Sequence, residues 1–256
     1  MENKTVVITG SSSGMGKAMA ERFGLEGANV VLTGRNEEKL ITTKKELELK
    51  ASKGSFIHIP IDVRSPEDIK KMVEVTVENF GTIDHLVNNA AGNFICPAEE
   101  LSVNGWNSVI DIVLNGTFYC SKEVGKYWID QKKQGSILNM VATYAWNAGA
   151  GVIHSSAAKA GVLNMTRTLA VEWGTKYGIR VNAIAPGAIE RTGGAEKLFE
   201  SKKAVERTLQ SIPLGRTGTP EEIAELAAFM LSEKAAYING EVITMDGGQW
   251  LNKFPF

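Results

Sequence analysis

The sequence predicts an α/β fold in which one doubly wound sheet of seven parallel strands carries helices on both faces. Short, nearly continuous apolar runs rich in β-branched residues alternate along the chain with longer segments of helical periodicity. This alternation is the pattern of βαβ units, whose strands are buried on both faces and therefore apolar throughout. The length of 256 residues suits one α/β domain, since such domains commonly reach about 200–250 residues. We expect residues 1–256 to form a single domain.

Each element is predicted from its own residues. The expected strands are 5–9, 29–33, 55–62, 83–88, 136–140, 180–184 and 241–245. The expected helices are 15–26, 36–52, 66–80, 104–130, 154–177 and 219–232. Gly81, Gly135 and Gly178 are each expected to end a helix just before the next strand. The segment 186–214 breaks the alternation, is rich in glycine and charge and holds at most a short helix near 195–210, so we expect it to cover a substrate.

Composition narrows the class of protein. The net charge of −1 gives no electrostatic argument for a nucleic acid or an acidic membrane surface as partner. Two cysteines, Cys96 and Cys120, do not form a disulfide framework and fit a reducing compartment. The three histidines show no metal-ligand grouping with them, so no metal site is expected. Strand-like residues begin at Lys4 and no apolar run approaches the ~20 residues of a membrane span, which favours a cytoplasmic protein.

A glycine-rich turn follows the first strand and opens the first helix. Its sequence is Thr9-Gly10-Ser11-Ser12-Ser13-Gly14-Met15-Gly16. Glycines let a backbone approach a pyrophosphate closely, and a helix N-terminus attracts the anion. A tight turn can also use glycine for steric reasons alone, but this placement favours a dinucleotide. The expected contacts are Gly10, Ser12, Ser13, Gly14, Met15 and Gly16.

The end of the second strand indicates which dinucleotide binds. An NAD site usually carries a carboxylate about 20 residues beyond the glycines, whereas Gly34 offers none and Arg35 offers a cation for a 2′-phosphate. The sequence therefore favours NADPH, the alternative for Arg35 being a solvated surface charge. Asp62, with its neighbour Val63, is expected near the adenine amine. Its rival interpretation is a carboxylate that stabilises the N-terminus of the next helix.

Two further turns are expected to border the cofactor. After the fourth strand, Asn89, Ala90 and Gly92 are expected to line it, while Asn88 is expected to tie neighbouring strands together. The tetrapeptide 186–189 follows the sixth strand. Its backbone donors are expected to meet the nicotinamide carboxamide, with Pro186, Gly187 and Ile189 as the cofactor-binding residues, or else the tetrapeptide is a simple turn.

These motifs together resemble the short-chain dehydrogenase/reductase family over essentially the whole chain. Most members carry a tyrosine four residues before a helix lysine, and in the run 154–161 that lysine is Lys159 and the earlier position is Ser155. The nearest tyrosine is Tyr144, just past the fifth strand. This spacing, together with the segments 89–94, 111–117 and 237–248, is similar to NADPH-dependent 2,4-dienoyl-CoA reductases. The resemblance implies a Rossmann-like domain, an acyl-CoA substrate and a homotetramer formed through the helices at 104–130 and 154–177.

The same resemblance implies the active-site roles. Asn93, Tyr144 and Lys159 would form the site, and hydride delivery to Cδ of a dienoyl thioester would be followed by protonation at Cα to give a 3-enoyl-CoA. Negative charge then develops on the thioester oxygen, where neutral donors from Tyr144 and Asn93 would form an oxyanion hole. Lys159 would bind the nicotinamide ribose. Ser155, one helical turn before it, would support the site.

Substrate contacts are implied more weakly. By resemblance, Arg64, Phe94 and Ser102 would touch the acyl-CoA, and Arg191 or Lys197 would meet a CoA phosphate, although each is also an ordinary surface residue. Many family members carry an active-site asparagine in the helix at 104–130. Val113 takes that position here, so Asn115 is expected to brace the helix, and its part in the site stays open.

Two alternatives to a dienoyl-CoA reductase stay open. One is a 3-oxoacyl thioester or carbonyl reductase in which Tyr144 protonates a carbonyl oxygen, although Ser155 replaces the usual tyrosine. The other is a nucleotide-binding scaffold without catalysis, which would fit if Tyr144 pointed into the core. Retention of Lys159 and of a second donor, Asn93, argues against the scaffold.

Overall fold

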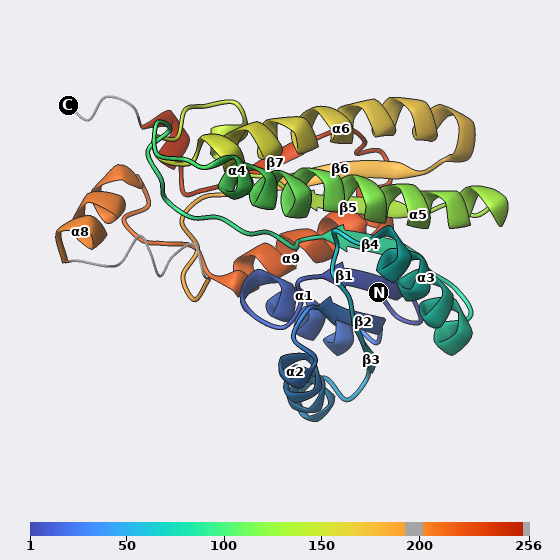
Figure 1. Ribbon diagram of the computed structural model, residues 1–256. Coiled ribbons are helices and arrows are strands. Elements are labelled where there is room, and N and C mark those ends of the chain that lie inside the picture. Colours follow the sequence, from blue (N-terminus) through green and yellow to red (C-terminus); the bar gives the residue numbers. More distant parts are fainter. Residues whose placement is uncertain (193–201, 253–256) are drawn as a thin grey trace.

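The protein is built around one parallel sheet, seen in a computed structural model that describes residues 1–192 and 202–252 (Figure 1). The strand order is β3-β2-β1-β4-β5-β6-β7, and every neighbouring pair is parallel. The strands are β1 (Thr5–Thr9), β2 (Asn29–Gly34), β3 (Ser55–Pro60), β4 (His85–Asn88), β5 (Ser136–Met140), β6 (Arg180–Pro186) and β7 (Val242–Met245). The predicted seven-stranded, Rossmann-like α/β fold is confirmed.

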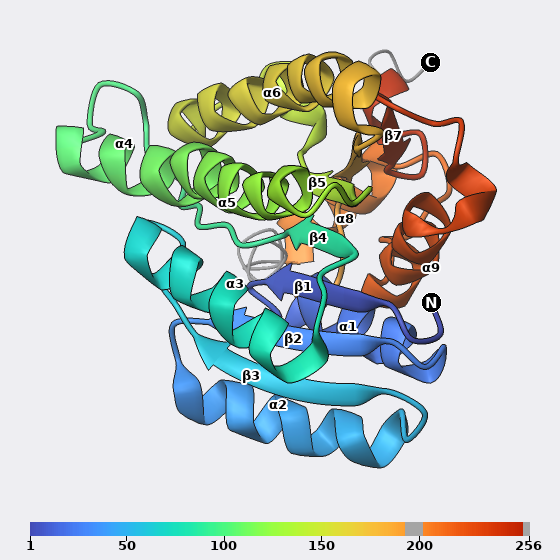
Figure 2. The ribbon, with the colours of Figure 1, turned by 90° about the vertical axis from the view of Figure 1, so that its right-hand side faces the viewer.

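Helices cover the sheet in two layers (Figures 1 and 2). One layer holds α1 (Gly14–Leu25), α2 (Glu37–Lys50) and α9 (Pro220–Leu231), and the other holds α3 (Pro66–Phe80), α5 (Gly116–Asp130) and α6 (Ile153–Tyr177). Alternate residues of β1 serve the two layers: Val6 and Ile8 pack with the first and Val7 with the second. Burial on both faces explains why the strand sequences are apolar throughout.

The remaining helical elements are short and lie between the larger ones. They are α4 (Val103–Ile110), the π-helical η1 (Asp111–Asn115), η2 (Thr143–Ala145), α8 (Lys202–Ser211), η3 (Glu233–Ala235) and η4 (Gln249–Leu251). The predicted continuous helix at 104–130 is therefore interrupted, because η1 inserts a π-helical turn between α4 and α5. The helix predicted near 195–210 lies partly outside the described residues, and α8 occupies the described part.

The glycines predicted to end helices behave differently from one another. Gly81 and Gly178 follow α3 and α6 in the left-handed conformation, as predicted, with φ of 73° and 67°. The prediction for Gly135 is wrong, because α5 ends at Asp130 and Lys132 takes the left-handed turn instead. Gly135 is required for space: a Cβ there would lie 2.3 Å from the buried indole of Trp128.

The strand order identifies the edge of the sheet at which a ligand is expected to bind. From β1 the chain adds β2 and β3 on one side of the sheet. It then returns to the other side of β1 and adds β4 to β7, so the direction of winding switches between β1 and β4. In open α/β sheets, ligands bind at the carboxyl ends of the strands beside such a switch. The turns 10–16 and 89–92 both lie there. Cys96 and Cys120 are free thiols, and no helix in the described ranges is long and apolar enough to cross a membrane.

Candidate active site

The turn after β1 is shaped by glycines that no other residue can replace without strain. Gly10 and Gly14 have φ of 66° and 52°, in the region that disfavours side chains. A Cβ on Gly16 would lie 2.4 Å from the Gly10 carbonyl oxygen, and one on Gly10 would lie 2.9 Å from Ala90 Cα. The turn therefore packs directly on the end of β4, and its glycines put no side chain between the backbone and a ligand. This cradle fits a dinucleotide pyrophosphate.

Asn89 joins that turn to β4. Its Nδ2 donates to the carbonyl oxygens of Thr9, at 3.0 Å, and Gly10, at 2.9 Å. The Thr9 hydroxyl in turn accepts from the backbone N–H groups of Asn89 and Ala90. The side chain of Asn89 thus braces the cradle, and its predicted contact with the cofactor, like those of Ala90 and Gly92, remains a prediction.

The carboxyl ends of β2 and β3 hold the groups predicted for the adenosine half. Arg35 is exposed, and its charge reaches Asp62 and helps to lower the pKa of that carboxyl. The largest cause of the lowered pKa is the hydrogen bond from Arg64, whose Nε lies 3.0 Å from both Asp62 carboxylate oxygens. Arg64, predicted to touch substrate, is therefore paired with Asp62, predicted to bind adenine. Buried Val63 lies under Gly116, where a Cβ would come within 2.8 Å of its side chain.

Tyr144 and Lys159 both have hydrogen-bond partners at the junction between β5 and α6. The short helix η2 places the Tyr144 hydroxyl 3.1 Å from the Ser155 Oγ in the first turn of α6. One turn further, Lys159 Nζ donates to the Met140 carbonyl oxygen at 2.5 Å. The hydroxyl of Tyr144 therefore lies against Ser155. Ser155 occupies the helix position at which the family that the sequence resembles usually has its tyrosine.

Burial sets the ionisation of both groups. Burial raises the pKa of Tyr144, an effect that the hydrogen bond with Ser155 only partly offsets, so the phenol stays protonated and can donate. Burial also lowers the pKa of Lys159 from 10.5 to about 8. At neutral pH the site combines a neutral hydrogen-bond donor with a buried cation.

The loop after β4 brings the second predicted donor to the same end of the sheet. Asn93 is exposed there and Phe94 is partly buried. The Phe94 ring stands edge-to-face on the His154 ring, with centroids 4.5 Å apart. The backbone N–H of Cys96 donates to the Gly151 carbonyl oxygen at 2.9 Å. The loop is therefore docked on the segment that leads into α6 and its Ser155.

A buried chain of polar side chains supports the strands beneath the site. Asn88 Nδ2 donates to Ser121 Oγ at 3.0 Å and to Asn139 Oδ1 at 2.8 Å, and Asn139 Nδ2 donates to Thr166 Oγ1 at 2.9 Å. The structural role predicted for Asn88 agrees with these bonds. Sequence reasoning missed Asn139, although an asparagine within the apolar run 136–140 was a signal for it.

Other predicted residues have structural partners. Ser102 caps α4 by accepting from the Gly105 N–H at 3.0 Å, and its predicted substrate contact remains a prediction. Asn115 donates to Asp111 Oδ1 at 2.9 Å and so braces η1, as expected. Val113, at the position of the family asparagine, is buried.

In the turn after β6, two of the three predicted residues have no backbone N–H free to donate to the nicotinamide carboxamide. Pro186 has no N–H, and the N–H of Gly187 already donates to the Met245 carbonyl oxygen at 3.0 Å. Gly187 also packs closely on β7, because a Cβ there would lie 2.5 Å from Asp246 Cβ. The predicted backbone donor therefore falls on Ile189, which forms an isolated bridge with Gly218.

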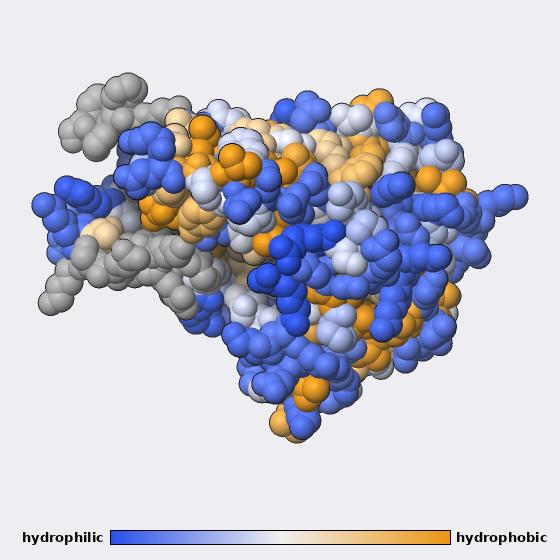
Figure 3. Space-filling model, in the orientation of Figure 1, coloured by the Kyte–Doolittle hydropathy of each residue, from blue (hydrophilic) through white to orange (hydrophobic). Residues whose placement is uncertain are grey.

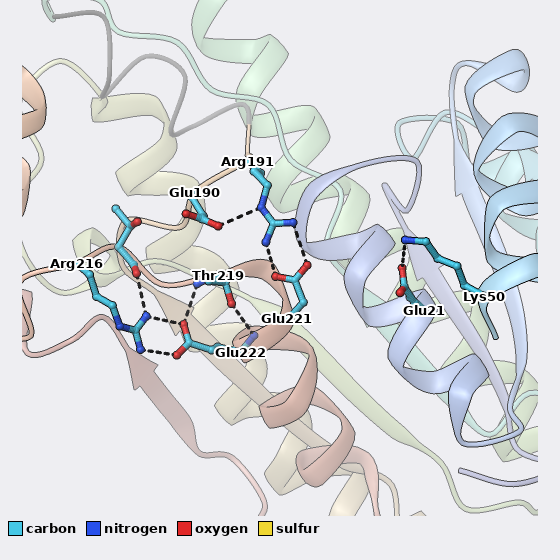
Figure 4. A network of polar contacts seen from close by, with 9 residues as sticks. Glu21, Lys50, Glu190, Arg191, Arg216, Thr219, Glu221 and Glu222 are labelled. Carbon is cyan, nitrogen blue, oxygen red and sulfur yellow. Dashed lines mark hydrogen bonds and ion pairs between the residues drawn. The ribbon is translucent and has the colours of Figure 1, made fainter. Parts of the chain in front are cut away.

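Ion pairs to α9 hold the predicted cover segment at Arg191 and the turn just beyond its end at Arg216 (Figure 4). Arg191 binds Glu221 through both terminal nitrogens and Glu190 through Nε. Arg216 binds Glu222, the residue that completes the capping box of α9. A CoA phosphate would therefore compete with carboxylates for Arg191. The other predicted phosphate contact, Lys197, lies outside the described residues.

Apolar side chains border the carboxyl ends of the strands. Exposed large apolar residues occur in the segments that follow β4, β5, β6 and β7, and Figure 3 shows apolar residues gathered on the side of the molecule next to α8. They are Ile95, Trp146, Ile153, Leu214 and Leu251. Trp146, from the loop after β5, stands edge-to-face on Trp250, from the segment after β7, with centroids 5.9 Å apart. The two indoles thus meet across the end of β6.

Comparisons with known proteins find relatives that match the chain over nearly its whole length. A protein family described as enoyl-(acyl carrier protein) reductase matches residues 10–249. A Bacillus subtilis (strain 168) protein named a probable 2,4-dienoyl-CoA reductase, (2E)-enoyl-CoA-producing, is 66% identical over 256 residues, the full length of both chains. A Danio rerio protein named peroxisomal 2,4-dienoyl-CoA reductase, (3E)-enoyl-CoA-producing, is 40% identical over 251 residues, covering 98% of this chain and 83% of the relative.

Solved structures give the same result for the fold. The crystal structure of a short chain dehydrogenase from Bacillus anthracis str. 'Ames Ancestor' superposes with a TM-score of 0.91 at 63% identity, covering 99% of each chain. Similarity of this extent, over sequence and backbone together, covers both the nucleotide cradle and the segment that carries Tyr144 and Lys159. The chain belongs to the short-chain dehydrogenase/reductase family.

Proposed function

We propose that this protein is an NADPH-dependent 2,4-dienoyl-CoA reductase that acts in the oxidation of unsaturated fatty acids. The observation that carries the proposal is the 3.1 Å hydrogen bond between Tyr144 and Ser155. It supplies a phenol from after β5 to the place where most of the family has its tyrosine on the helix. The names of the two relatives support the substrate class, and the apolar side chains around the site suit an acyl chain.

The residues of this chain stabilise charge rather than move a proton to carbon. A nicotinamide nucleotide held at the cradle of Gly10, Gly14 and Gly16 would supply a hydride to Cδ of the dienoyl thioester, which would place the displaced electron pair on the thioester oxygen. Tyr144 and Asn93 donate hydrogen bonds to that oxygen. Ser155 is placed to donate to the phenol oxygen, which leaves the phenol proton directed at substrate. Each preorganised donor of this kind typically contributes about 3 kcal/mol to stabilising the transition state.

Lys159 contributes a positive charge that forms no ion pair with a carboxylate within residues 1–192 and 202–252. Its pKa is lowered by burial alone, with no carboxylate among the causes. Two of the three ammonium protons remain after the bond to the Met140 carbonyl oxygen. We assign these protons to the ribose hydroxyls of the nicotinamide nucleotide. The charge also stabilises the dienolate electrostatically, because the site has a low dielectric constant.

The two named relatives differ in the position of the double bond that remains in the product. One name specifies a (2E)-enoyl-CoA product and the other a (3E)-enoyl-CoA product. We propose the 3-enoyl product for this chain, through protonation at Cα by water. In a dienolate held at its oxygen, Cα carries the greatest charge density and is protonated fastest. Formation of the 2-enoyl product would require an acid placed beside Cγ.

One assay tests the proposal against its alternatives. The purified protein is offered NADPH with either a 2,4-dienoyl-CoA or a 3-oxoacyl-CoA, and NADPH oxidation is followed. The reaction is then repeated in D₂O and the site of deuterium is read by NMR. We expect turnover of the dienoyl thioester, with deuterium at Cα. Turnover of only the oxo substrate would identify a carbonyl reductase, and nucleotide binding without turnover would identify a scaffold.

The preference for NADPH rests on Arg35. We expect Arg35→Ala to raise the KM for NADPH about 10- to 100-fold and to leave the KM for NADH within about twofold, because a hydrogen bond to a charged group contributes about 1.5–3 kcal/mol. Lys126→Ala is the control, since it removes an exposed cation at the far end of α5. Equal effects of Arg35→Ala on both nucleotides would show that Arg35 does not read the 2′-phosphate.

We further infer a cytoplasmic homotetramer in which residues 186–214 cover the bound acyl-CoA. Phe118 on α5 and Val171 on α6 are exposed apolar side chains on the helices that the family resemblance assigns to the interface. Light scattering of the purified protein tests the stoichiometry. A monomer at micromolar concentration would contradict it.

A further inference from the structure

We infer that His154 is a positioning residue that sets the places of Ser155 and Phe94, and through them of the donors Tyr144 and Asn93. The inference extends the proposed function, because it concerns how the two donors are held. His154 lies in the first turn of α6 and is completely buried. Neither the nucleotide cradle nor the reaction described above uses it.

The first contact of His154 fixes Ser155. The Ser155 N–H donates to His154 Nδ1 at 2.9 Å. This N–H is one of the first-turn donors that a helix leaves without an intrahelical partner. Because Nδ1 accepts, the ring proton must be on Nε2. The bond therefore holds the backbone of Ser155, whose hydroxyl meets the Tyr144 hydroxyl at 3.1 Å.

The second contact of His154 fixes the loop after β4. The imidazole and the Phe94 ring are perpendicular, with an interplanar angle of 88° and centroids 4.5 Å apart. Edge-to-face pairs at this separation are favourable and define the orientation of both rings. Phe94 directly follows Asn93, so one imidazole lies between the backbone segments that carry the two proposed donors.

The remaining atom of the ring argues against a purely structural role. Nε2 is buried and has no hydrogen-bond partner within the described part of the chain. A buried N–H without a partner lowers stability, and a phenyl ring of similar shape would avoid that loss. If His154 only filled space, His154→Phe would leave the protein as stable or more stable and fully active.

The chain offers a matched control for this substitution. His85, at the start of β4, is also buried and also has a ring nitrogen, Nδ1, without a partner. It lies at the amino end of its strand, on the edge of the sheet opposite the site. His85→Phe therefore makes the same chemical change away from Tyr144, and we expect it to leave kcat within about twofold.

The experiment measures kcat, KM, NADPH affinity and Tm for His154→Phe and His154→Asn. Asparagine keeps an acceptor oxygen where Nδ1 lies, whereas phenylalanine removes it. We expect His154→Phe to lower kcat about tenfold with KM, NADPH Kd and Tm nearly unchanged. We expect His154→Asn to recover most of that loss. In the Tyr144→Phe background, His154→Phe should cost clearly less than the tenfold that it costs alone, because the part of its effect that acts through Tyr144 is already lost.

Several results would overturn the inference. They are an unchanged kcat in His154→Phe, a loss no greater than that in His85→Phe, a loss that follows a fall in Tm, and full additivity with Tyr144→Phe. A readout independent of turnover separates this inference from the proposed function. Nitrogen-15 NMR should show His154 protonated at Nε2 only, and the Ser155 amide proton should shift upfield in His154→Phe. Failure of those signals overturns the positioning role whichever substrate the enzyme reduces.

Discussion

Replacing Tyr144 with phenylalanine is expected to lower kcat for a 2,4-dienoyl-CoA about 100-fold. The substitution removes one hydroxyl and keeps the ring, so packing in η2 is preserved. The lost group is a preorganised donor to the oxygen on which charge develops, and such a donor contributes about 3 kcal/mol. Because the hydroxyl is bonded to Ser155 and not to the nucleotide cradle, the Kd for NADPH should stay within about twofold. Stopped-flow turnover and fluorescence titration with NADPH give the two values.

Tyr127→Phe is the matched control for that substitution. Tyr127 is a partly buried tyrosine of α5 that packs in the core on one face of the sheet, so its hydroxyl can be removed without touching the site. We expect its kcat to stay within about twofold of the unaltered enzyme. Retention of more than about a third of kcat in Tyr144→Phe would mean that Tyr144 does not hold the dienolate. A loss carried entirely by weaker NADPH binding would assign Tyr144 to the cofactor instead.

The strands could be predicted from the sequence because each is buried on both faces. β1 has the predicted bounds, since Val6, Val7 and Ile8 must all be apolar to serve two layers of helices. β3 was predicted to run to residue 62 and ends at Pro60. Ile61 and Val63 continue the apolar pattern beyond the strand because they are buried in the layer below α3 and α5. Hydrophobicity thus located the strands better than it located their ends.

The π-helical turn could not be predicted, because its cause is tertiary. The residues 104–130 have helical character throughout, and an added residue in one turn changes which face is buried without changing composition. In the structure, Gly116 follows η1 and packs on Val63, and a Cβ would come within 2.8 Å. π-Helical turns are frequent near functional sites. Here the turn contains Val113, which is buried.

Only part of the candidate active site could be predicted, because some of its contacts follow from local spacing and others depend on tertiary structure. Ser155 and Lys159 share a helix face by their spacing, whereas the place of Tyr144 in the site was implied by the family resemblance. His154 was not predicted as a functional residue. Its importance depends on contact with Phe94, sixty residues earlier in the chain, and on a nitrogen whose lack of a partner only coordinates can show.

Lys159→Met is expected to stabilise the protein at pH 7 while lowering kcat at least 100-fold. The lysine is buried and its pKa is lowered from 10.5 to about 8. At pH 7 the ammonium is protonated in both the folded and the unfolded chain, and the shift corresponds to a cost of about 3 kcal/mol in the folded state. Methionine fills similar space without charge. After allowing about 1 kcal/mol for the lost bond to the Met140 carbonyl oxygen, Tm should rise by about 4–8 °C.

The pH dependence identifies the cause of that stabilisation. Between pH 8 and 10.5 the folded protein binds fewer protons at Lys159 than the unfolded chain, so the free energy of unfolding rises with pH. The Tm advantage of Lys159→Met should therefore be largest at pH 7 and nearly absent at pH 10. Lys70→Met, which alters an exposed lysine of α3, should show no such trend. Calorimetry from pH 7 to 10 measures all three proteins.

A stability gain coupled to loss of turnover would have a definite meaning. An uncompensated ammonium is unfavourable in the folded apoprotein, and such strain is commonly found where a site must act on a ligand. NADPH should then stabilise the unaltered protein more than Lys159→Met, because the ribose hydroxyls supply the missing acceptors. A lower Tm for Lys159→Met at pH 7, or a difference that is constant with pH, would show instead that Lys159 holds the fold through its bond to Met140 and that the cofactor does not depend on its charge.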